Sequence, residues 1–578
     1  MSVEPVQVLE ADVLVVGGGA AACMAAIRAD AEGARVLVVD KGQLGKSGCS
    51  PNAHGGMAIH HKLPGDSWRV HVEDTLLGGG FVNDQELVRI MCQEGPRFIR
   101  RLEEFGSLFD RDPDGTYSVR KFGGHRYARS VFSGDETGHE MMIGLRREVL
   151  RRGIQVLDEV MATRLLTREG AVVGAFAWGV GDGGFYEVRA PSVVLATADA
   201  AGIWPSASER QRGDGFLLAL EAGAELLDME FIQYHPTHAW WPFGVRGSVS
   251  ESFRSEGGHL LNAAGERFMA RYDPEKMELA TRDRVSVAVM EEIRAGRGAP
   301  HGGIFASVAH LPAEQIERRL PVIFRKYQSY GYDIRKEPIE VRPRPHYHCG
   351  GVRITPGGAA TVPGLFAAGA VTAGVHGANR LGTNALVDIL VFGEIAGRSA
   401  ARNALRQPGP GPESPMQAAA EARRIADLAD RPLDGGVSIP PLRRRHIELM
   451  DQHMGVIRTA AGMQAMLQEV ERAKAEDLPR LAIRDKARRY NYELRDALEM
   501  PFRLAVEEMA ARAALLRAES RGCHYREDFP RRNDRDWLKN IGFVQRNGDL
   551  QVLTRDVQTH VVPLEDLPDY ARSDSPWH

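Results

Sequence analysis

The chain has 578 residues, of which 73 are Lys or Arg and 77 are Asp or Glu, so its formal net charge at pH 7 is −4. That length corresponds to roughly three to four domains of ordinary size. The near balance of charge argues against a nucleic-acid-binding role. No apolar run approaches the ~18 residues of a bilayer-spanning helix, and the acidic start lacks the features of a signal peptide, so we expect a cytoplasmic protein.

The cysteines predict neither a disulfide framework nor an iron–sulfur cluster, because they are scattered without paired spacing. They are Cys23, Cys49, Cys92, Cys349 and Cys523. We therefore predict no metal site in this chain. Any iron–sulfur centre would belong to a separate partner.

The first chemical motif is a strand, a glycine-rich turn and a helix. A short apolar strand ends at Val16, and the helix-compatible run starts at Cys23. In the intervening GGGAAA, Gly17 permits a tight turn, Gly19 lets the backbone approach a pyrophosphate, and Ala22 allows close helix packing. The next strand, RVLVVD, ends at Asp40, where a carboxylate can bind ribose hydroxyls.

The segment after this second strand favours FAD over NAD. It runs on from Lys41 to Ile59 without a predicted helix, and a long glycine-rich loop suits the bulky isoalloxazine ring. Its apolar close, GGMAI, argues against an ordinary surface loop. The predicted cofactor contacts in this loop are Lys41, Ser47, Cys49, Gly55 and Gly56.

A second glycine-rich region lies near the middle of the chain. A short buried strand followed by a loop is predicted over residues 364–374, and HGANRLGTNALVD follows from His376 to Asp388. If Arg380 is buried, its guanidinium needs an anionic partner. The segment therefore indicates an anion or cofactor contact.

These motifs and others stand in one order along the chain. They are FGGHRYAR (122–129), DETGH (135–139), GDG (213–215), MEFIQYHPT (229–237), SESFRSEGGHLLNAAGERF (250–268), ELATRDRVS (278–286), HYHCGG (346–351), HGANRLGTNAL and ESRGCHYREDFP (519–530). In this order they resemble the flavoprotein subunit family of succinate dehydrogenase and fumarate reductase, which also includes L-aspartate oxidase. The resemblance runs almost from end to end.

The resemblance implies an α/β fold in several parts. These are a Rossmann-like FAD-binding domain (1–230 and 350–405), an inserted α+β capping domain (231–349), a C-terminal helical domain (416–540) and a tail (541–578). The Pro/Gly-rich stretch from Gln407 to Pro415 is typical of a linker. In the helical domain an apolar stripe ends before Gly522, which is predicted to stop the helix; its members are Phe502, Val506, Met509, Ala513 and Leu516. Alternating residues near the C-terminus predict a strand pair.

The resemblance also implies a dicarboxylate site. His346 and Arg380 are expected to hold one carboxylate, and His235 and Ser250 the other, with the arginine gripping its carboxylate through two parallel hydrogen bonds. It further implies the cofactor contacts Asp214, Gly369, Asn384 and Leu386.

A proton donor is implied at Arg282. The resemblance places Glu251 and Arg254 beside it as a proton relay toward solvent. Spacing alone favours a different interpretation, an ion pair between Arg282 and the adjacent Asp283. A free arginine is a poor acid, so the proton-donor role requires a confined site.

Several positions depart from the family pattern. Cys49 stands where respiratory members carry the histidine that links FAD covalently, so we predict noncovalent FAD, with a thioether to Cys49 as the alternative. In the family, loss of the linkage favours reduction or oxidase chemistry. Ser250 replaces a threonine, and ATADAAG (196–202) replaces a glycine-richer flavin contact. In the long loop after Thr237, we expect the aromatic side chains to pack the cap rather than line a pocket.

We draw three hypotheses from this pattern. The first is a flavoprotein subunit that interconverts fumarate and succinate, or a close dicarboxylate, and exchanges electrons with an iron–sulfur partner, with or without a membrane quinone-reactive subunit. Such partners would hold it at the inner face of the cell membrane. The second is a soluble flavoenzyme similar to L-aspartate oxidase, favoured by HYHCGG and the long loop before Ser250. The third is a noncatalytic FAD-bearing electron-transfer subunit.

Overall fold

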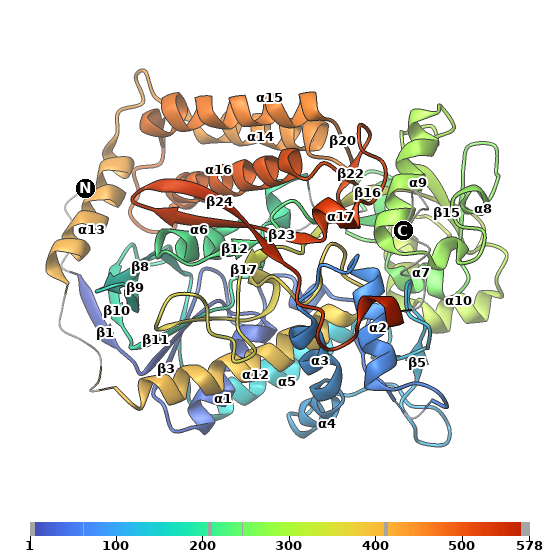
Figure 1. The fold of residues 1–578 in the computed structure, drawn as a ribbon, viewed down its shortest axis with the longest axis horizontal. Helices are drawn as coiled ribbons and strands as arrows, with labels where there is room; N and C mark the ends of the chain where they lie inside the picture. The colour runs from blue at the N-terminus through green and yellow to red at the C-terminus, as the bar shows by residue number, and fades with distance from the viewer. Residues whose placement is uncertain are drawn as a thin grey trace.

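The computed structural model describes residues 6–61, 63–205, 211–245, 247–407, 409 and 414–567. Its elements are drawn in Figure 1. Most of the predicted linker, residues 408 and 410–413, and the end of the predicted tail, residues 568–578, lie outside the described residues. Within the described ranges, none of the helices combines the length and the apolar character needed to span a membrane.

A five-stranded parallel sheet forms the core of the first region. Its order is β18 (Leu365–Ala367), β11 (Ser192–Leu195), β2 (Val13–Val16), β3 (Val36–Asp40) and β7 (Gln155–Asp158). The central strands β11 and β2 are buried throughout, as expected for a parallel sheet covered on both faces. Because parallel strands end at one edge, this sheet places the turns after β2, β3, β11 and β18 together.

Two helices pack unusually close beside this sheet. They are α1 (Ala20–Ala31) and α12 (Asn384–Ala404), the long helix along the lower edge of the molecule in Figure 1. A Cβ added at Gly397 would lie 2.2 Å from the carbonyl oxygen of Ala25. Helix α1 begins at Ala20, three residues before the predicted Cys23, because Gly19 already serves as its N-cap.

Smaller elements complete the part of the chain around the parallel sheet. A four-stranded sheet has the order β1 (Gln7–Glu10), β10 (Phe185–Arg189), β9 (Ala171–Gly179) and β8 (Val160–Arg168). A three-stranded sheet has the order β4 (Met57–Ala58), β6 (Ser130–Val131) and β5 (Val119–Arg120). The helices are α2 (Trp68–Gly78), α3 (Gln85–Glu94), α4 (Arg97–Glu104), α5 (Thr137–Arg151) and α6 (Asp214–Glu221).

Residues 232–348, which we call the cap, build a separate antiparallel sheet with its own apolar core. The strand order is β13 (Ile232–Trp241), β16 (Ile339–His348), β15 (Ile304–Ser307) and β14 (His259–Leu261). Its helices are α7 (Glu251–Ser255), α8 (Met269–Tyr272), α9 (Arg282–Arg294), α10 (Ala313–Arg319) and α11 (Pro321–Gln328). In Figure 1 the cap lies to the right of the five-stranded parallel sheet.

The C-terminal region is mainly helical. Its helices are α13 (Pro415–Asp430), α14 (Ile439–His453), α15 (Ala460–Arg472), α16 (Tyr492–Leu516) and α17 (Asp534–Trp537). Two short strand pairs join them: β19 (Val437–Ser438) with β21 (Leu481–Ala482), and β20 (Ile457–Arg458) with β22 (Tyr525–Arg526).

The predicted end of α16 at Gly522 is wrong. The helix ends at Leu516, because Arg517 turns away from helical geometry and buries its guanidinium against Glu230 and Glu519. The predicted apolar stripe is buried except at its last member, Leu516, which is 42% exposed. The stripe therefore packs into the core, as expected.

The predicted terminal strand pair is present and has a partner. β23 (Lys539–Arg546) and β24 (Asp549–Asp556) form a hairpin whose turn residues, Asn547 and Gly548, both have positive φ. β23 also pairs with β12 (Leu226–Leu227), which pairs with β17 (Gly351–Val352). The C-terminal segment is thus bound into a sheet with the two chain segments that enter and leave the cap.

Candidate active site

The turn between β2 and α1 leaves room for a phosphate group. The amide of Ala20 donates to Ser50 Oγ over 3.3 Å, and the first turn of α1 carries no acidic residue. A Cβ at Gly19 would have Ser50 Oγ, 3.4 Å away, as its nearest neighbour, whereas one at Gly17, where φ is +121°, would lie 2.3 Å from the Ala196 carbonyl oxygen. Gly17 is therefore required by the fold, and Gly19 leaves the helix N-terminus open to an anion.

Asp40 lies at the end of β3 beside this turn. Its Oδ2 accepts a hydrogen bond from Ser47 Oγ over 2.8 Å, and a Cβ at Gly18 would come within 2.2 Å of the same oxygen. The carboxylate is thus held against the glycine turn, the position that a ribose-binding residue needs. Lys41, next in sequence, forms ion pairs of 3.1 Å with Asp214 and with Glu499 of α16.

Polar atoms without partners lie near the same turn. Within the described part of the chain, Thr197 Oγ1 and Asp214 Oδ1 are buried without a hydrogen-bond partner. A Cβ at Gly215 would lie 2.0 Å from Thr197 Oγ1, so the backbone approaches that hydroxyl closely. Open helix N-terminus, carboxylate and unpaired hydroxyl together fit the phosphates and ribityl hydroxyls of FAD.

The loop from Lys41 to Ile59 lies between the two helix N-termini. It contains a single 3-10 turn, Ser50–Asn52, with the partly exposed Cys49, which forms no disulfide, as its N-cap residue. A Cβ at Gly55 would lie 3.1 Å from Thr383, the residue that precedes α12, and Gly56 has a φ of +131°. Cys49 thus lies on the loop that contacts the N-termini of both α1 and α12.

The remaining predicted cofactor residues lie near the start of α12. Gly369 has positive φ, and a Cβ there would lie 3.0 Å from Ala21 Cβ of α1. Leu386 is buried. The side chain of Asn384 is engaged within the protein, because it donates to Thr75 Oγ1 over 3.0 Å and lies 2.9 Å from His71 Nε2.

Arg282 is the first residue of α9 and is buried beside Glu251. Its Nε donates to Glu251 Oε2 over 2.8 Å, and Arg254 Nη2 lies 3.6 Å from the same oxygen. Arg282 thus pairs with Glu251, so the ion pair with Asp283 expected from spacing alone is wrong: Asp283 accepts instead from Asn379 over 2.9 Å.

The charges of this group are strongly coupled. Burial alone would raise the pKa of Glu251, but Arg282 and Arg254, with a 3.0 Å hydrogen bond from the Gly123 amide, lower it to about 2. Glu251 is therefore an ionised carboxylate at neutral pH. Arg254 is fully buried and donates to the Glu278 carbonyl over 2.6 Å, so its guanidinium does not itself reach solvent.

Gln233, which the sequence reasoning missed, connects this group to the Arg380 loop. Its Oε1 accepts from Arg282 Nη1 over 3.0 Å, and its Nε2 donates to the Arg380 carbonyl over 2.6 Å and to Asn379 Oδ1 over 2.7 Å. The available signal was position, because Gln233 and His235 are two residues apart on β13 and face the same side. Gln233 thus joins the Arg282 guanidinium to the backbone of the Arg380 loop.

Arg380 is buried and incompletely paired. Its Nε has no hydrogen-bond partner among the described residues, and Nη1 makes a long 3.4 Å contact with the Leu381 carbonyl. The guanidinium lies over the Tyr347 ring, 4.7 Å from its centre. Burial, and after it the charge of Arg282, lowers the pKa of Arg380 to about 10.

His235 and His346 lie together on adjacent strands, with ring centres 5.3 Å apart. Burial and the charge of Arg282 hold the pKa of each well below its usual value, so both rings are neutral at neutral pH. A neutral imidazole can still donate one N–H to a carboxylate. Ser250 is the N-cap of α7, and its hydroxyl donates to Ser252 Oγ over 3.0 Å.

The 196–202 segment, which departs from the family pattern, contains a buried carboxyl group. In the 196–202 segment, Asp199 is buried and accepts from the amides of Ala201 and His348 over 2.9 and 3.1 Å. Burial raises the pKa of Asp199 to about 7.

The Trp241 ring stacks on His301 with centres 3.9 Å apart, and Phe243 packs against both, so these aromatics pack on the cap as predicted.

Comparison with known proteins extends this picture. Residues 12–386 match the family described as FAD binding domain, and residues 443–569 match that described as Fumarate reductase flavoprotein C-term. The chain is 43% identical over 540 residues to a fumarate reductase (CoM/CoB) subunit of Methanothermobacter marburgensis, covering 93% of this chain and 97% of that protein. It is 36% identical to the fumarate reductase flavoprotein subunit of Mycobacterium tuberculosis, covering 93% and 95%.

Solved structures agree with the sequence matches. FrdA of E. coli quinol fumarate reductase superposes with a TM-score of 0.91 at 33% identity, covering 96% of this chain and 98% of that chain. Fold, site and matches define an FAD-dependent oxidoreductase, which confirms the predicted fold class and cofactor. The chain belongs to the family of fumarate reductase and succinate dehydrogenase flavoprotein subunits.

Proposed function

We propose that this chain reduces fumarate to succinate, or interconverts a close pair of dicarboxylates, with noncovalently bound FAD. The observation that carries the proposal is the hydrogen-bonded link from Glu251 through Arg282 and Gln233 to the loop of Arg380. This link supports a site in which Arg282 would donate a proton while the two groups, His346 with Arg380 and His235 with Ser250, would each bind a carboxylate. The names of the relatives support the same substrate pair.

The cofactor contacts follow from the fit described above. Gly19 at the start of α1 would receive the pyrophosphate and Asp40 the ribose, while Gly17 forms the tight turn. When bound, FAD supplies hydride acceptance and donation. Because Cys49 stands in the place of the family's linking histidine, the protein would hold FAD by noncovalent contacts and would favour the reductive direction.

The two ends of the substrate would be held differently. Arg380 would grip one carboxylate through its planar guanidinium, supplying the anion that this buried charge needs, with His346 beside it. Neutral His235 and the Ser250 hydroxyl would donate to the other carboxylate. Arg380 and Arg282 both lie in a buried site, where charge interactions are stronger than in water.

The proton would come from Arg282. Its ordinary acidity is far too weak for free proton release, so transfer requires that the Glu251 carboxylate accept a proton from Arg254 and pass it at once to the Arg282 guanidinium. The 2.8 Å contact between Glu251 and Arg282 supports that step, and Arg254 extends the chain of proton carriers by one residue. Gln233 would keep the Arg282 plane aimed at the substrate carbon.

Electrons would be exchanged with a separate protein. Several relatives are named as subunits of fumarate reductase or succinate dehydrogenase, which supports an iron–sulfur or quinone-linked partner that holds this chain at the inner face of the membrane. The alternative of an L-aspartate oxidase predicts iminoaspartate from aspartate. The alternative of a noncatalytic electron-transfer protein predicts no dicarboxylate binding.

The test is a titration of the FAD-loaded protein followed by the flavin absorption spectrum. Fumarate should bind at least about 100-fold more tightly than crotonate, its monocarboxylate analogue, because losing one charge-assisted carboxylate contact costs roughly 3 kcal/mol. Equal binding of the two acids would contradict a two-ended site. Spectral response to aspartate with iminoaspartate formation, and none to fumarate, would favour the oxidase instead.

A further inference from the structure

Two arginines of β16, Arg342 and Arg344, extend one face of the cap sheet beyond the proposed carboxylate site; we call them the arginine row. Arg344 lies opposite His235 in the register of β16 and β13, and Arg342 lies opposite His238. Opposed residues of an antiparallel pair have Cβ atoms about 5 Å apart, and residues two apart on one strand point to the same face. The arginine row therefore begins beside His235, one of the proposed carboxylate-binding residues.

Both guanidinium groups of the row lie against one indole ring. The guanidinium carbons of Arg342 and Arg344 are 5.0 and 4.8 Å from the centre of the Trp240 ring. Nη1 of Arg344 also donates to the Pro205 carbonyl over 3.0 Å, and the indole N–H of Trp240 donates to the His301 carbonyl over 2.6 Å. The ring and the two cations are thus held by aromatic and backbone contacts.

The positive charge of the arginine row is not balanced by a neighbouring acid. Within the described part of the chain, neither Arg342 nor Arg344 forms an ion pair with a carboxylate, and the Asp451 charge acts on Arg344 only from beyond ion-pair distance. Burial lowers the pKa of Arg344, whose charge is therefore incompletely hydrated. His238 adds no charge at neutral pH, because burial lowers its pKa to about 4. The row is thus suited to attract an anion.

We propose that Arg342, Arg344 and Trp240 form an entry site that captures dicarboxylate anions before they reach Arg380. The inference rests on the proposed function for the identity of the ligand, and on the placement of the arginine row for the site itself. Two adjacent guanidinium groups complement the two negative charges of such a ligand. Charges of one sign beside a site raise the local concentration of an oppositely charged substrate and its rate of association.

The expected effect is on association and depends on salt. Residues two apart on a strand are separated by about 7 Å, which is the spacing along β16 between Arg344 and His346. At that distance, one positive charge changes the encounter rate of a dianion about fivefold at an ionic strength of about 0.01 M. At about 1 M salt the Debye length falls to about 3 Å, so the effect disappears.

The experiment follows fumarate binding to the oxidised, FAD-loaded chain by stopped-flow flavin absorbance, so that no electron transfer intervenes. Arg342→Gln and Arg344→Gln should each lower the association rate constant about fivefold at about 0.01 M ionic strength and approach the wild-type value at about 1 M. Glutamine at position 344 can still donate to the Pro205 carbonyl. Arg344→Lys keeps the charge and should retain the wild-type rate.

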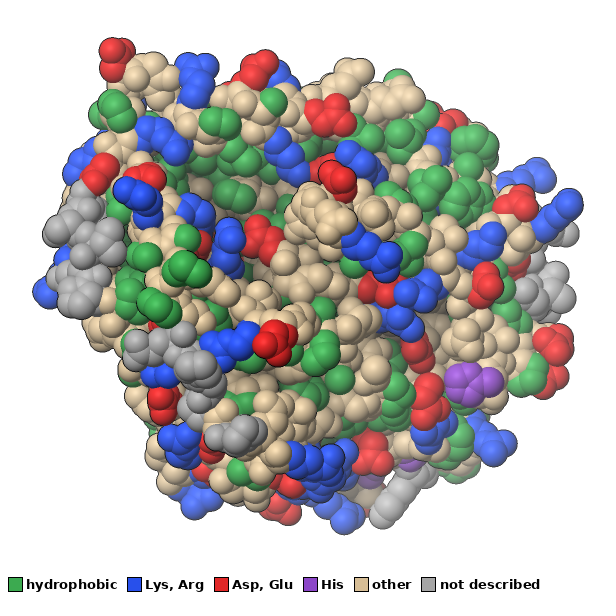
Figure 2. Space-filling view, turned by 60° about the vertical axis from the view of Figure 1, so that its left-hand side comes forward, with side chains coloured by type: hydrophobic (Ala, Val, Ile, Leu, Met, Phe, Trp, Pro, Cys, Tyr) green, Lys and Arg blue, Asp and Glu red, His purple; other side chains and the backbone are tan. Residues whose placement is uncertain are grey.

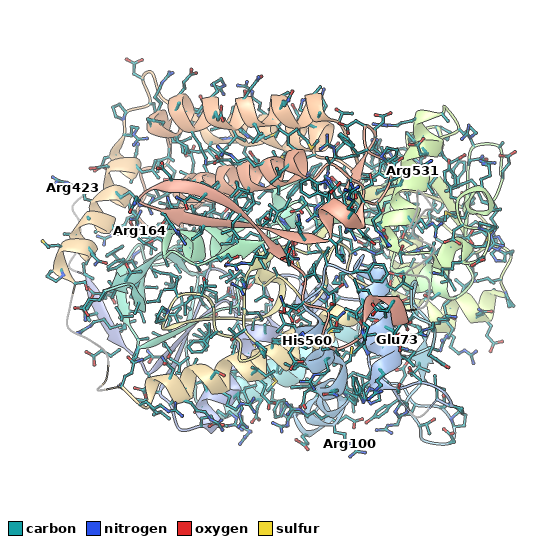
Figure 3. All side chains as sticks on the ribbon, in the orientation of Figure 1. Glu73, Arg100, Arg164, Arg423, Arg531 and His560 are labelled. Atoms are coloured by element: carbon teal, nitrogen blue, oxygen red, sulfur yellow. The ribbon has the colours of Figure 1, made fainter. Side chains whose placement is uncertain are left out.

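Arg423→Gln is the matched control. It removes the same charge from an exposed position on α13, at the opposite end of the molecule from the cap (Figure 3), and it should associate with fumarate at the wild-type rate. Wild-type association by both Arg342→Gln and Arg344→Gln at low salt would overturn the proposal. A loss of equal size at low and high salt would also overturn it, because the effect of a charge must be screened.

A second measurement does not depend on the flavin signal. Phenylglyoxal modifies arginine side chains, and peptide mapping by mass spectrometry reports which of them have reacted. Fumarate should slow the modification of Arg342 and Arg344 in the FAD-loaded wild type and leave that of Arg423 unchanged. Protection without any flavin response would support the entry site and count against the proposed function. Modification of Arg342 and Arg344 at the same rate with and without fumarate would overturn the entry site, whatever the flavin shows.

Discussion

At the residue scale, the Arg282 side chain has two hydrogen-bond partners, and both limit how it can move. Glu251 pairs with its Nε and Gln233 accepts from its Nη1, so the guanidinium plane is fixed from two sides. Lysine at this position would keep the charge but lose the planar group that binds both partners at once.

We therefore predict that Arg282→Lys lowers turnover by about 100-fold to 10,000-fold, the usual contribution of a positioned acid, while FAD content stays unchanged. Steady-state fumarate reduction and the flavin absorbance of the purified protein measure the two quantities. Arg284→Lys is the control on the same helix, since Arg284 pairs with Asp273, and it should retain activity. Full turnover in Arg282→Lys would refute the proton-donor role.

Gln233→Leu should raise the KM for fumarate and lower kcat together. Leucine removes hydrogen bonds to both arginine segments and leaves Arg282 with one partner, a cost of about 1–3 kcal/mol. The expected loss in kcat/KM is thus about 10-fold to 100-fold, and steady-state kinetics measure it. Tyr234→Phe, one residue along β13 and bonded to the Met454 carbonyl, is the control that should behave as wild type.

Asp199 predicts a pH-dependent stability. Its folded pKa, about 7, is raised above the ordinary value of 3.8, so the folded protein keeps a proton that the unfolded chain has released. This contribution is fully present below pH 4 and is lost as the pH rises to about 7; it amounts to at most about 4 kcal/mol.

Asp199→Asn removes that dependence. The melting temperature of the variant relative to wild type should therefore rise between pH 5 and pH 8, as followed by circular dichroism. A constant difference across this range would show that Asp199 does not titrate there.

At the scale of elements, the turn between β2 and α1 contains a position where a substitution should weaken cofactor binding without impairing folding. Gly19→Ala should fold normally, because the added Cβ finds ordinary contact distances, yet it should bind FAD more weakly because the methyl group takes space that the pyrophosphate needs. The melting temperature of the apoprotein tests the expected folding, and the affinity for FAD tests the expected loss of binding. Gly357→Ala, where a Cβ would also have room, is the control that should keep FAD; unchanged affinity in Gly19→Ala would place the phosphates elsewhere.

Local patterns explain which elements were predictable from the sequence. The order of strand, glycine turn and helix at Val13–Ala31 depends on neighbouring residues, and the α16 stripe depends on helical spacing. The Arg517 turn that ends α16 depends on Glu230, nearly 300 residues away, so it could not be seen locally. The pairing of β23 with β12 is equally long-range.

The candidate site was also predictable only in part, because some of its contacts leave no local signal in the sequence. Arg282, Glu251 and Arg254 were expected together from the resemblance, and the structure brings them together. Gln233 was missed because a neutral amide gives no charge signal, and only its two-residue spacing from His235 pointed to it. Spacing alone favoured Asp283 as the partner of Arg282 and the resemblance favoured Glu251, and the structure pairs Arg282 with Glu251.

At the scale of the whole molecule, the site lies where separately folded parts meet. Arg282 and Glu251 come from the cap, whereas Arg380 comes from the loop before α12. The C-terminal region also contacts the cap through Arg294 and Glu527, 3.6 Å apart, and Arg531 lies at this junction in Figure 3. The space-filling view in Figure 2 shows basic and acidic side chains interspersed on one face.

This arrangement makes cap orientation important for activity. The 3.0 Å bond between Gln233 and Arg282 is made within the cap, while the bonds from Gln233 to Asn379 and the Arg380 carbonyl cross to the FAD-domain part. A shift of the cap would therefore separate the proposed proton donor from the carboxylate clamp, and catalysis depends on such alignment.

The most direct test of fumarate reduction is anaerobic stopped-flow mixing of the flavin-reduced protein with fumarate. The account predicts flavin reoxidation at about 1–1000 per second, the range of ordinary enzyme turnover, with one succinate formed for each flavin. A flavin that stays reduced with fumarate but is oxidised by added dioxygen would contradict it.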